Sequence, residues 1–213
     1  MKRYMNGHVA SERRKDARRE RENRGRVPNV QIGREKRASA QIREADEDDV
    51  PIVLQLTKDA YAEYAPDFGP AWAPYLHMLE LAVTGANAKR LVADEDGGVV
   101  GIVLLFLPGS YPGYQARAST EALDIPEIRF LAVSHLSRGR GVGEAIMRAA
   151  IEDASHAGHP AVGLHTISFM TAARRLYAKL GFLRDERADF TVPAGLLVEG
   201  YRLELNARSD RLQ

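Results

Sequence analysis

Glycines and arginines gather directly before an apolar helical pattern in the segment SRGRGVGEAIMRAA, residues 137–150. The first N–H groups of a helix lack internal partners and carry partial positive charge, so they attract anions. Glycines let those groups approach a ligand with no Cβ in the way, and arginines add fixed charges with forked donors that suit phosphate. The residues concerned are Arg138, Gly139, Arg140, Gly141 and Gly143. The segment therefore predicts an anion site, and a pyrophosphate is its natural ligand.

Two widespread phosphate-binding motifs do not fit this segment. A P-loop needs Gly-Lys-Ser/Thr, whereas Gly143 is followed by Glu144 and Ala145. A dinucleotide fingerprint needs Gly-x-Gly-x-x-Gly, and residues 139–143 supply only Gly-x-Gly-x-Gly. A glycine-rich turn that simply joins a strand to a helix stays open as the alternative from this segment alone.

Two segments together resemble the GNAT superfamily of acyl-CoA-dependent N-acetyltransferases. They are EIRFLAVSHLSRGRGVGEAIMRAAI, residues 127–151, and AARRLYAKLGF, residues 172–182. The family's pyrophosphate loop, Arg/Gln-x-x-Gly-x-Gly/Ala, matches residues 138–143, and its Leu-Tyr-x-x-x-Gly-Phe motif lies in the second segment. The resemblance spans about residues 39–206. It implies the GNAT fold, an α/β domain with a central mixed β-sheet flanked by helices.

The resemblance implies acetyl-CoA as co-substrate and indicates where it would bind. The fourth strand of the family splays from its neighbour, which leaves backbone groups to pair with the pantetheine arm and to polarise the thioester carbonyl. Here those groups belong to Leu131, Ala132 and Val133. The pyrophosphate is expected on the loop and helix start, formed by Arg138, Gly139, Arg140, Gly141, Val142 and Gly143.

Acetyl transfer to an amine requires two proton movements. An alkyl ammonium has a pKa of about 10 and must lose a proton, and a departing thiolate, of pKa about 8.5, gains from receiving one. For the first, the resemblance points to Glu127 as a base acting directly or through water. Since a carboxylate of ordinary pKa is a weak base for an ammonium, we favour a water relay or electrostatic attraction of the ammonium. For the second, the resemblance points to Tyr177, a phenol beside the cofactor sulfur.

Each of these residues also has a structural interpretation. Glu127 could pair with an arginine at a strand end, and Tyr177 could pack on the inner stripe of its helix. His165, on a second buried strand, is an alternative base or a satisfied core histidine. Many relatives carry Asn seven residues before the Tyr, where this chain has Met170, which cannot donate the same hydrogen bond. The cofactor contact there would fall to the backbone or to Ser168.

The acceptor of this fold usually lies between the first helical pair and the loops opposite the cofactor. That region is rich in aromatic residues, which predict either a partly apolar acceptor pocket or ordinary packing of two short helices. The aromatic residues are Tyr61, Tyr64, Phe68, Trp72, Tyr75, Tyr111 and Tyr114. Because the net charge beyond residue 37 is negative, the sequence favours a cationic acceptor.

Hydrophobic periodicity outlines the elements that would position these residues. A short strand near Ile42 precedes a helix that Asp46 could cap, with Ile52, Val53, Leu54, Leu56 and Ala60 on its inner face. Three further helices are expected: one that begins near Ala73, one from Val142 to Ala157 and one over residues 169–182. Strands are expected at residues 90–107 (a β-hairpin), 124–134, 161–167, 187–192 and 200–205.

Composition narrows the class of protein. The chain has 213 residues, 45% of them hydrophobic, which suffices for one domain with a core and an appendage. It has no cysteine, so disulfides, a thiol nucleophile and thiolate zinc sites are excluded, and we expect no metal site. No apolar run has the length to cross a bilayer and no secretory signal is recognisable, so we expect a soluble, cytoplasmic protein without membrane contact.

Charge is unevenly distributed along the chain. Residues 1–37 hold 13 basic and 5 acidic residues, whereas the rest holds 17 basic and 24 acidic ones. Because this arm contains almost no apolar residues, we expect residues 1–38 to be disordered, followed by one domain at residues 39–207 and a tail at 208–213. A solvated tail is the favoured interpretation of the arm, and contact with nucleic acid stays open.

The sequence supports one function and keeps two others in view. We expect an N-acetyltransferase that moves an acetyl group from acetyl-CoA to a primary amine of a small molecule or peptide, by direct attack in a ternary complex. The alternatives are a non-catalytic acyl-CoA-binding regulatory module with a docking arm, and a nucleic-acid-binding protein whose glycine loop grips backbone phosphate. Whether the chain forms a homodimer stays open.

Overall fold

The computed structural model describes residues 40–108, 110, 124–192 and 194–205. These residues all belong to the second of two units into which the chain divides, Ala38–Gln213. The predicted basic arm and C-terminal tail lie outside the described residues, as do Tyr111 and Tyr114. Among the described helices, none is both long and apolar enough to cross a membrane.

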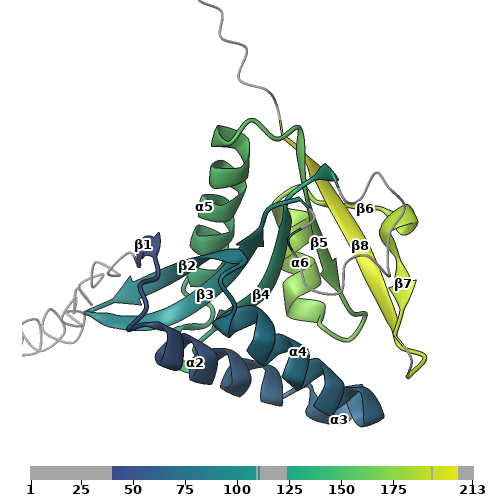
Figure 1. Ribbon diagram of the computed structural model, residues 1–213, viewed down its shortest axis with the longest axis horizontal. Coiled ribbons are helices and arrows are strands. Elements are labelled where there is room, and N and C mark those ends of the chain that lie inside the picture. Colours follow the sequence, from purple (N-terminus) through teal and green to yellow (C-terminus); the bar gives the residue numbers. More distant parts are fainter. Residues whose placement is uncertain (1–39, 109, 111–123, 193, 206–213) are drawn as a thin grey trace, which may run out of the picture. The chain divides into compact units, whose positions relative to one another are not determined.

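A mixed β-sheet forms the middle layer of this unit (Figure 1). Its strands, in spatial order, are β1 (Gln41–Glu44), β2 (Ala88–Glu95), β3 (Gly98–Phe106), β4 (Glu127–Val133), β5 (Ala161–Thr166), β8 (Leu197–Glu204) and β6 (Leu183–Arg184). A further strand, β7 (Phe190–Thr191), pairs with β8. β4 and β5 run parallel, and the other described pairs are antiparallel. The predicted α/β class with a central mixed sheet is confirmed.

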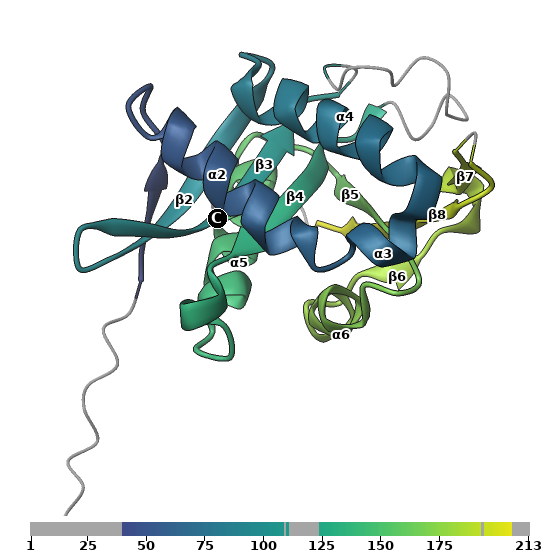
Figure 2. The same ribbon diagram turned by 90° about the horizontal axis from the view of Figure 1, so that it is seen from below.

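Helices cover both faces of the sheet. Figure 2 shows α2 (Val50–Ala62), α3 (Ala65–Phe68) and α4 (Trp72–Thr84) on one face, and α5 (Val142–His156) and α6 (Thr171–Lys179) on the other. Short 3-10 turns lie between these elements at Gly69–Ala71, His135–Ser137 and Glu186–Ala188.

Two apolar core layers follow from this arrangement. In β3, Ile102, Leu104 and Phe106 pack toward α2 and α4, whereas Val103 and Leu105 pack toward α5. All five side chains are 5% exposed or less. The uninterrupted apolar run of this strand is therefore explained by burial on both faces, which rewards an apolar residue at every position.

The predicted hairpin is confirmed, and its turn chemistry explains it. Asp96 and Gly97 connect β2 to β3 with φ of 52° and 82°. A two-residue loop that follows the twist of its strands needs positive φ at both central residues, which Gly adopts freely and Asp tolerates.

The first helix begins later than Asp46 would predict. The Asp46 carboxylate accepts hydrogen bonds from the N–H groups of Asp48 and Asp49, at 3.0 and 3.1 Å, so it closes a turn before the helix. α2 then begins at Val50, with a proline in its first turn. In this register Ile52, predicted on the inner face, is 54% exposed.

The C-terminal strands also differ from the prediction. The strand expected at residues 187–192 is reduced to β7, because the preceding residues form a 3-10 turn. The Asp185 carboxylate accepts a hydrogen bond from the Arg187 N–H group and so stabilises that turn. β8 begins three residues earlier than the expected strand, and β6 was not predicted.

Candidate active site

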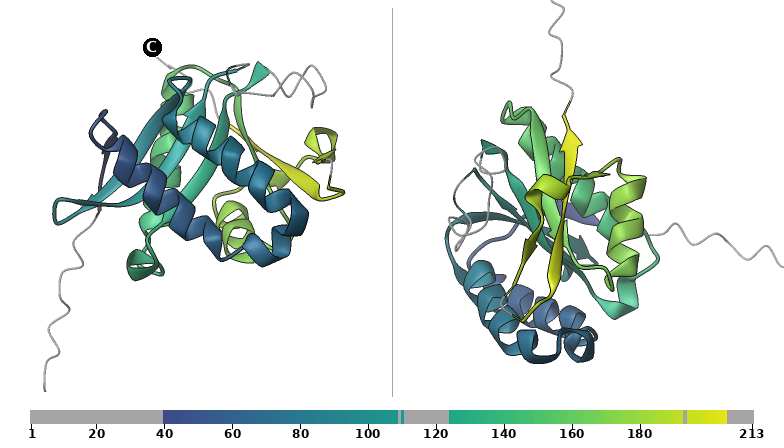
Figure 3. Two further views of the ribbon diagram at one scale, coloured as in Figure 1. Left: turned by 60° about the horizontal axis from the view of Figure 1, so that its bottom comes forward. Right: turned by 90° about the vertical axis from the view of Figure 1, so that its right-hand side faces the viewer.

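β4 and β5 pair only where they begin. Glu127 lies opposite Gly163 and Ile128 opposite Leu164, and no later residue of β4 has a partner in β5. The two strands diverge toward their carboxyl ends (Figure 3). The backbone of residues 129–133 therefore has no ladder partner on its β5 side. The predicted cofactor residues Leu131, Ala132 and Val133 lie on this stretch.

A β-bulge turns the backbone of β4 at the start of this stretch. Two residues of β4, Phe130 and Leu131, face a single residue of β3, Val103. Phe130 has a φ of 54°, a conformation that costs on the order of 1–3 kcal/mol for a bulky residue. Bulges and such strained residues concentrate next to functional sites, because they re-aim the main chain.

A cavity of about 1050 Å³ opens where the strands diverge. Its wall combines side chains of α2, α4 and β4 with residues of α5, α6 and the C-terminal strands. Most of the predicted site residues line it, namely Leu131, Ala132, Val133, Arg138, Gly139, Gly141, Val142, Gly143 and Tyr177. The predicted Arg140 and Glu127 do not reach the wall.

The glycine loop has the geometry that an anion cradle requires. Gly139 and Gly141 have φ of 73° and 90°, and a Cβ on either would meet no atom within 4 Å. Gly141 precedes α5, which has no side-chain cap, and the first hydrogen bond of this helix joins the Ala145 N–H to the Gly141 carbonyl. The N–H groups of the first turn, residues 142–144, therefore have no acceptor within the helix. The structure does not require glycine at position 143, because this residue lies in the helix and a Cβ there would make only ordinary van der Waals contacts.

The two arginines of the loop are already engaged. The Arg138 guanidinium donates to both carboxylate oxygens of Glu63, at 2.8 and 3.0 Å. The Arg140 guanidinium lies 2.9 Å from the carboxylate of Glu95. The loop is thereby tied to α2 and β2, and the backbone amides carry more of its attraction for an anion than its sequence suggests.

Lys179 is a cation on the cavity wall that the sequence did not single out. Its ammonium group contacts the carboxylate of Glu144, in the first turn of α5, and Arg148 contacts the same carboxylate at 2.9 Å. Local sequence could not indicate that Lys179 lies beside the glycine loop, because Lys179 and Glu144 belong to different helices that meet only in the fold.

Tyr177 reaches the cavity from α6. Its side chain is 8% exposed, and its ring packs edge-on against Phe182 with the ring centroids 6.1 Å apart. Burial raises the pKa of the phenol well above its ordinary value, and the neighbouring Tyr61 adds to this effect. Tyr177 therefore stays protonated and keeps a proton that it can donate.

Glu127 is a buried carboxylate behind the cavity wall. It is 3% exposed, and its Oε1 atom lies 2.7 Å from Arg129 and 2.5 Å from Nδ1 of His165. Its Oε2 atom has no hydrogen-bond partner among the described residues. Burial alone would raise the pKa of Glu127, but the charges and hydrogen bonds of Arg129 and His165 outweigh burial and lower it to about 2.

His165 uses both ring nitrogens. Nδ1 faces the ionised Glu127, and Nε2 lies 2.9 Å from the carbonyl oxygen of Ala188, an atom that can only accept. Both ring nitrogens are therefore engaged, one by a carboxylate and the other by a backbone carbonyl. The arrangement combines the two structural interpretations drawn from the sequence, since Glu127 pairs with an arginine and His165 is hydrogen-bonded. Arg129 was not singled out, although its spacing of two from Glu127 puts both on one face of a strand.

The model of the acetyltransferase (GNAT) family matches residues 54–182, which include the bulged strand, the glycine loop and the Tyr177 helix. The chain belongs to the GNAT acetyltransferase family. The members of this family are acetyltransferases, and a solved structure that this chain resembles holds acetyl-CoA as its cofactor. The predicted family and fold are confirmed.

Solved GNAT structures share this fold. One, described as the histone acetyltransferase HPA2 and related acetyltransferase from Corynebacterium glutamicum, is 24% identical with a TM-score of 0.59, over 77% of this chain and 95% of that one. Another, yncA from Salmonella typhimurium with its cofactor acetyl-CoA, is 22% identical with a TM-score of 0.55, over 78% and 94%.

A curated relative shares part of the sequence. The N-acetylaspartate synthetase of Danio rerio is 38% identical over 88 residues, which cover 41% of this chain and 31% of that protein. The matched part of this chain thus spans about a third of the length of that relative.

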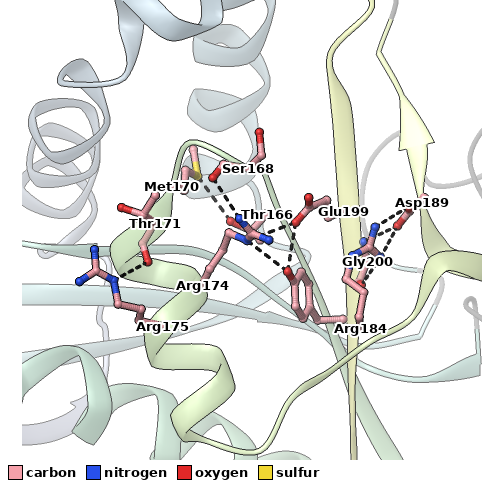
Figure 4. A network of polar contacts seen from close by, with 11 residues as sticks. Thr166, Ser168, Met170, Thr171, Arg174, Arg175, Arg184, Asp189, Glu199 and Gly200 are labelled. Atoms are coloured by element: carbon pink, nitrogen blue, oxygen red, sulfur yellow. Dashed lines mark hydrogen bonds and ion pairs between the residues drawn. The ribbon is translucent and has the colours of Figure 1, made fainter.

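At the position where many GNAT relatives carry Asn, this chain has Met170. Met170 lies on the cavity wall, and the Thr166 hydroxyl donates to its sulfur at 3.7 Å (Figure 4). Ser168, the predicted substitute, is not on the wall, and its carbonyl accepts a hydrogen bond from Arg174 at 3.3 Å. Arg174 also reaches Glu199 at 3.4 Å, so this network anchors the segment before α6 rather than facing the cofactor.

Of the aromatic residues predicted for the acceptor region, the five that the structure describes form one connected cluster. The rings of Phe68 and Tyr75 are 4.3 Å apart, and those of Tyr61 and Tyr75 are 5.8 Å apart. Trp72 and Tyr64 extend the cluster, and Phe130 and Phe169 join it from other elements. Since Tyr61, Tyr64, Phe68 and Tyr75 also line the cavity, the pocket and the packing interpretations both apply.

Proposed function

We propose that this protein transfers an acetyl group from acetyl-CoA to a primary amine of a small molecule or peptide, by direct attack in a ternary complex. The observation that carries the proposal is one continuous cavity. It joins the uncapped start of α5, the unpaired stretch of β4 and the aromatic cluster of α2 and α4. Both reactants can therefore meet beside Tyr177 without a covalent enzyme intermediate.

The cofactor half of the cavity is assigned as follows. The pyrophosphate binds the N–H groups at the start of α5, with Gly139, Gly141, Val142 and Gly143 around it. Arg138, Arg140 and Lys179 lie around the loop, but each is paired with a carboxylate and so adds less attraction for the pyrophosphate than an unpaired cation would. The pantetheine arm pairs with the backbone of Leu131, Ala132 and Val133, where β5 offers no competing ladder. A backbone N–H group there polarises the thioester carbonyl.

The reaction forms one bond and breaks another. The neutral amine nitrogen attacks the thioester carbonyl carbon, the C–N bond forms, and the C–S bond breaks to release the thiolate of coenzyme A. Tyr177, which burial keeps protonated before the reaction, donates its proton to the departing sulfur as negative charge develops there and recovers one from solvent.

Glu127 acts in this scheme through its neighbours. A carboxylate with a pKa of about 2 is too weak a base to deprotonate an ammonium directly, and it stands behind the wall. Water carries the amine proton away, and Glu127 holds Arg129 and His165 in place. We do not assign His165 as the base, because both of its ring nitrogens already contact protein atoms, Glu127 and the carbonyl of Ala188.

Calorimetric titration with acetyl-CoA and a thiol-release assay over a panel of amines test the proposal. The panel includes aspartate, after the relative named for N-acetylaspartate, together with aminoglycosides, polyamines and peptide N-termini. We expect micromolar binding and turnover of at least one amine. Binding without turnover of any amine would instead favour the non-catalytic acyl-CoA-binding module, and absence of binding would overturn both.

A further inference from the structure

The acceptor half of the cavity is walled by apolar side chains from two distant parts of the chain. One part runs from α3 into α4, and the other is the C-terminal segment around β7 and β8. Among the described residues of these two parts, none that lines the wall carries a charge. The largest side chains that they contribute are Phe68, Tyr75, Met78, Phe190, Leu196 and Val198.

The bulge of β4 connects this apolar wall to the proposed place of the thioester. Phe130, the bulged residue, lies with its ring 6.4 Å from that of Tyr61 and 6.2 Å from that of Tyr75. The residues that follow it directly, 131–133, form the stretch proposed to hold the pantetheine arm. An amine that reaches the thioester would therefore have the rest of its molecule against these rings.

The carboxylates on the wall are already paired with cations. Among the described residues, the carboxylates that line the cavity are those of Glu63 and Glu144. Glu63 pairs with Arg138 and Glu144 with Lys179, both next to the glycine loop. A second ammonium group on the acceptor would therefore meet no unpaired carboxylate on the described wall, and burying such a group without a partner is strongly unfavourable.

The other polar side chains of the wall give a charged acceptor little to bind. Burial raises the pKa of the Tyr61 and Tyr64 hydroxyl groups above the ordinary value, so both stay protonated and uncharged. Arg129 contacts the carboxylate of Glu127, and both ring nitrogens of His165 contact protein atoms. A carboxylate on the acceptor would have to compete with these contacts.

We propose that the acceptor is a primary amine joined to an apolar group, an alkyl chain or an aromatic ring, with no second charge. This inference rests on the proposed acetyltransferase function and deepens it by naming the class of acceptor. The apolar group lies against the α3–α4 segment and the C-terminal strands, while the nitrogen reaches the thioester beside Tyr177. The proposal differs from the expectation of a cationic acceptor, because the net charge of a domain does not determine which charges face its cavity.

Three acceptors of nearly one shape test the inference. Heptylamine ends in a methyl group, 1,6-diaminohexane carries an ammonium group in its place, and 7-aminoheptanoate carries a carboxylate there. In the thiol-release assay, we expect kcat/KM for heptylamine to exceed that for either charged analogue at least about 100-fold, because an unpaired charge is costly to bury. Attraction of the ammonium group to ring faces offsets only part of this cost.

The outcomes separate the inference from the proposed function. Equal or faster turnover of a charged analogue, or turnover of other amines but not of heptylamine, would overturn the inference and leave acetyltransferase function intact. If no amine is turned over, the proposed function itself fails. Shortening the chain from heptylamine to butylamine should lower kcat/KM about three- to fourfold for each methylene removed. Equal values along this series would contradict an apolar contact.

Two neighbouring leucines provide a matched pair of variants. Leu196 lines the cavity, whereas Leu197 does not and is 46% exposed. Leu196→Glu places a carboxylate on the wall, so the ratio of kcat/KM for heptylamine to that for 1,6-diaminohexane should fall about 100-fold. Leu197→Glu should leave this ratio within about twofold. An unchanged ratio in a Leu196 variant that thermal melting shows to be folded would contradict the proposal. The acceptor series on the parent protein tests it even if this variant does not fold.

Discussion

The two ends of the cavity are built by different means. At the cofactor end, residues 138–143 follow one another in the chain, and the groups that face the cavity include backbone amides. At the acceptor end, the polar groups are side chains from β4 and β5, and the surrounding wall comes from α2, α4 and the C-terminal strands. One end can be recognised from a short run of sequence, whereas the other exists only after the sheet has formed.

Charge is also handled differently at the two ends. At the cofactor end, Arg138 and Arg140 each have a carboxylate of their own, Glu63 and Glu95. At the acceptor end, Arg129 and His165 contact the same carboxylate oxygen, Oε1 of Glu127. An arginine in a motif therefore indicates positive charge less reliably than the ion pairs around it do.

The largest effect is expected on acetyl-CoA binding at the cofactor end. Gly141→Glu places a negative charge and a side chain in the cradle at a φ of 90°, so we expect affinity for acetyl-CoA to fall at least about 100-fold in calorimetric titration. Gly158→Glu is the matched control, because Gly158 has a φ of 81° and equally open surroundings at the other end of α5. If both variants bind acetyl-CoA like the parent protein, the loop is not the pyrophosphate site.

The next effect separates chemistry from binding at the junction of the two ends. Tyr177→Phe removes the proton donor, so kcat should fall by roughly 10²- to 10⁴-fold while the Kd for acetyl-CoA changes little. Steady-state kinetics with calorimetry measure both quantities. Tyr201→Phe, on β8 and off the cavity wall, provides the control. Equal turnover in the Tyr177 variant would leave this residue with a packing role only.

A third effect concerns the shared carboxylate of the acceptor end. Glu127→Gln removes the charge of the buried carboxylate that Arg129 and His165 both contact, which should cost about 3–5 kcal/mol of unfolding free energy. The folded pKa of about 2 lies below the reference value of 4.5, so the stabilisation is fully present above pH 4.5 and is lost as the pH falls toward 2. Urea unfolding of both proteins at pH 7 and pH 3 measures it. A stability difference independent of pH would contradict the assignment of charge to Glu127.

The smallest effect is expected from removing the carboxylate that pairs with Arg138 at the cofactor end. Glu63→Gln removes the carboxylate that engages Arg138, so its guanidinium becomes available to the cofactor. Because an exposed ion pair contributes little, we expect the Kd for acetyl-CoA to fall only about two- to fivefold, and less at high salt. Glu204→Gln, whose partner Arg202 lies off the cavity wall, is the control. Weaker binding in the Glu63 variant would show that this ion pair supports the loop.

Local signals explain what could be predicted. The hairpin rests on Asp96 and Gly97, the glycine loop on Gly139 and Gly141, and the buried strands on continuous apolar runs. Each signal is contained within a few neighbouring residues. The family resemblance then supplied the fold, a central mixed sheet flanked by helices, which local patterns alone do not give.

Long-range contacts explain what could not be predicted. Glu63 and Glu95, which engage the loop arginines, lie 75 and 45 residues before them in the chain, and no local pattern joins them. The start of α2 shifted because Asp46 closes a turn instead of capping the helix. The contact between Glu127 and His165 was not predicted, because β4 and β5 bring these two residues together only once the sheet has formed.

The crystal structure of the protein with coenzyme A tests the central claim most directly. We predict pyrophosphate oxygens within hydrogen-bond distance of the N–H groups of residues 142–144, and the pantetheine arm alongside Leu131 to Val133 with its sulfur beside the Tyr177 hydroxyl. Coenzyme A bound outside the opening between β4 and β5, with the start of α5 left in solvent, would contradict the account.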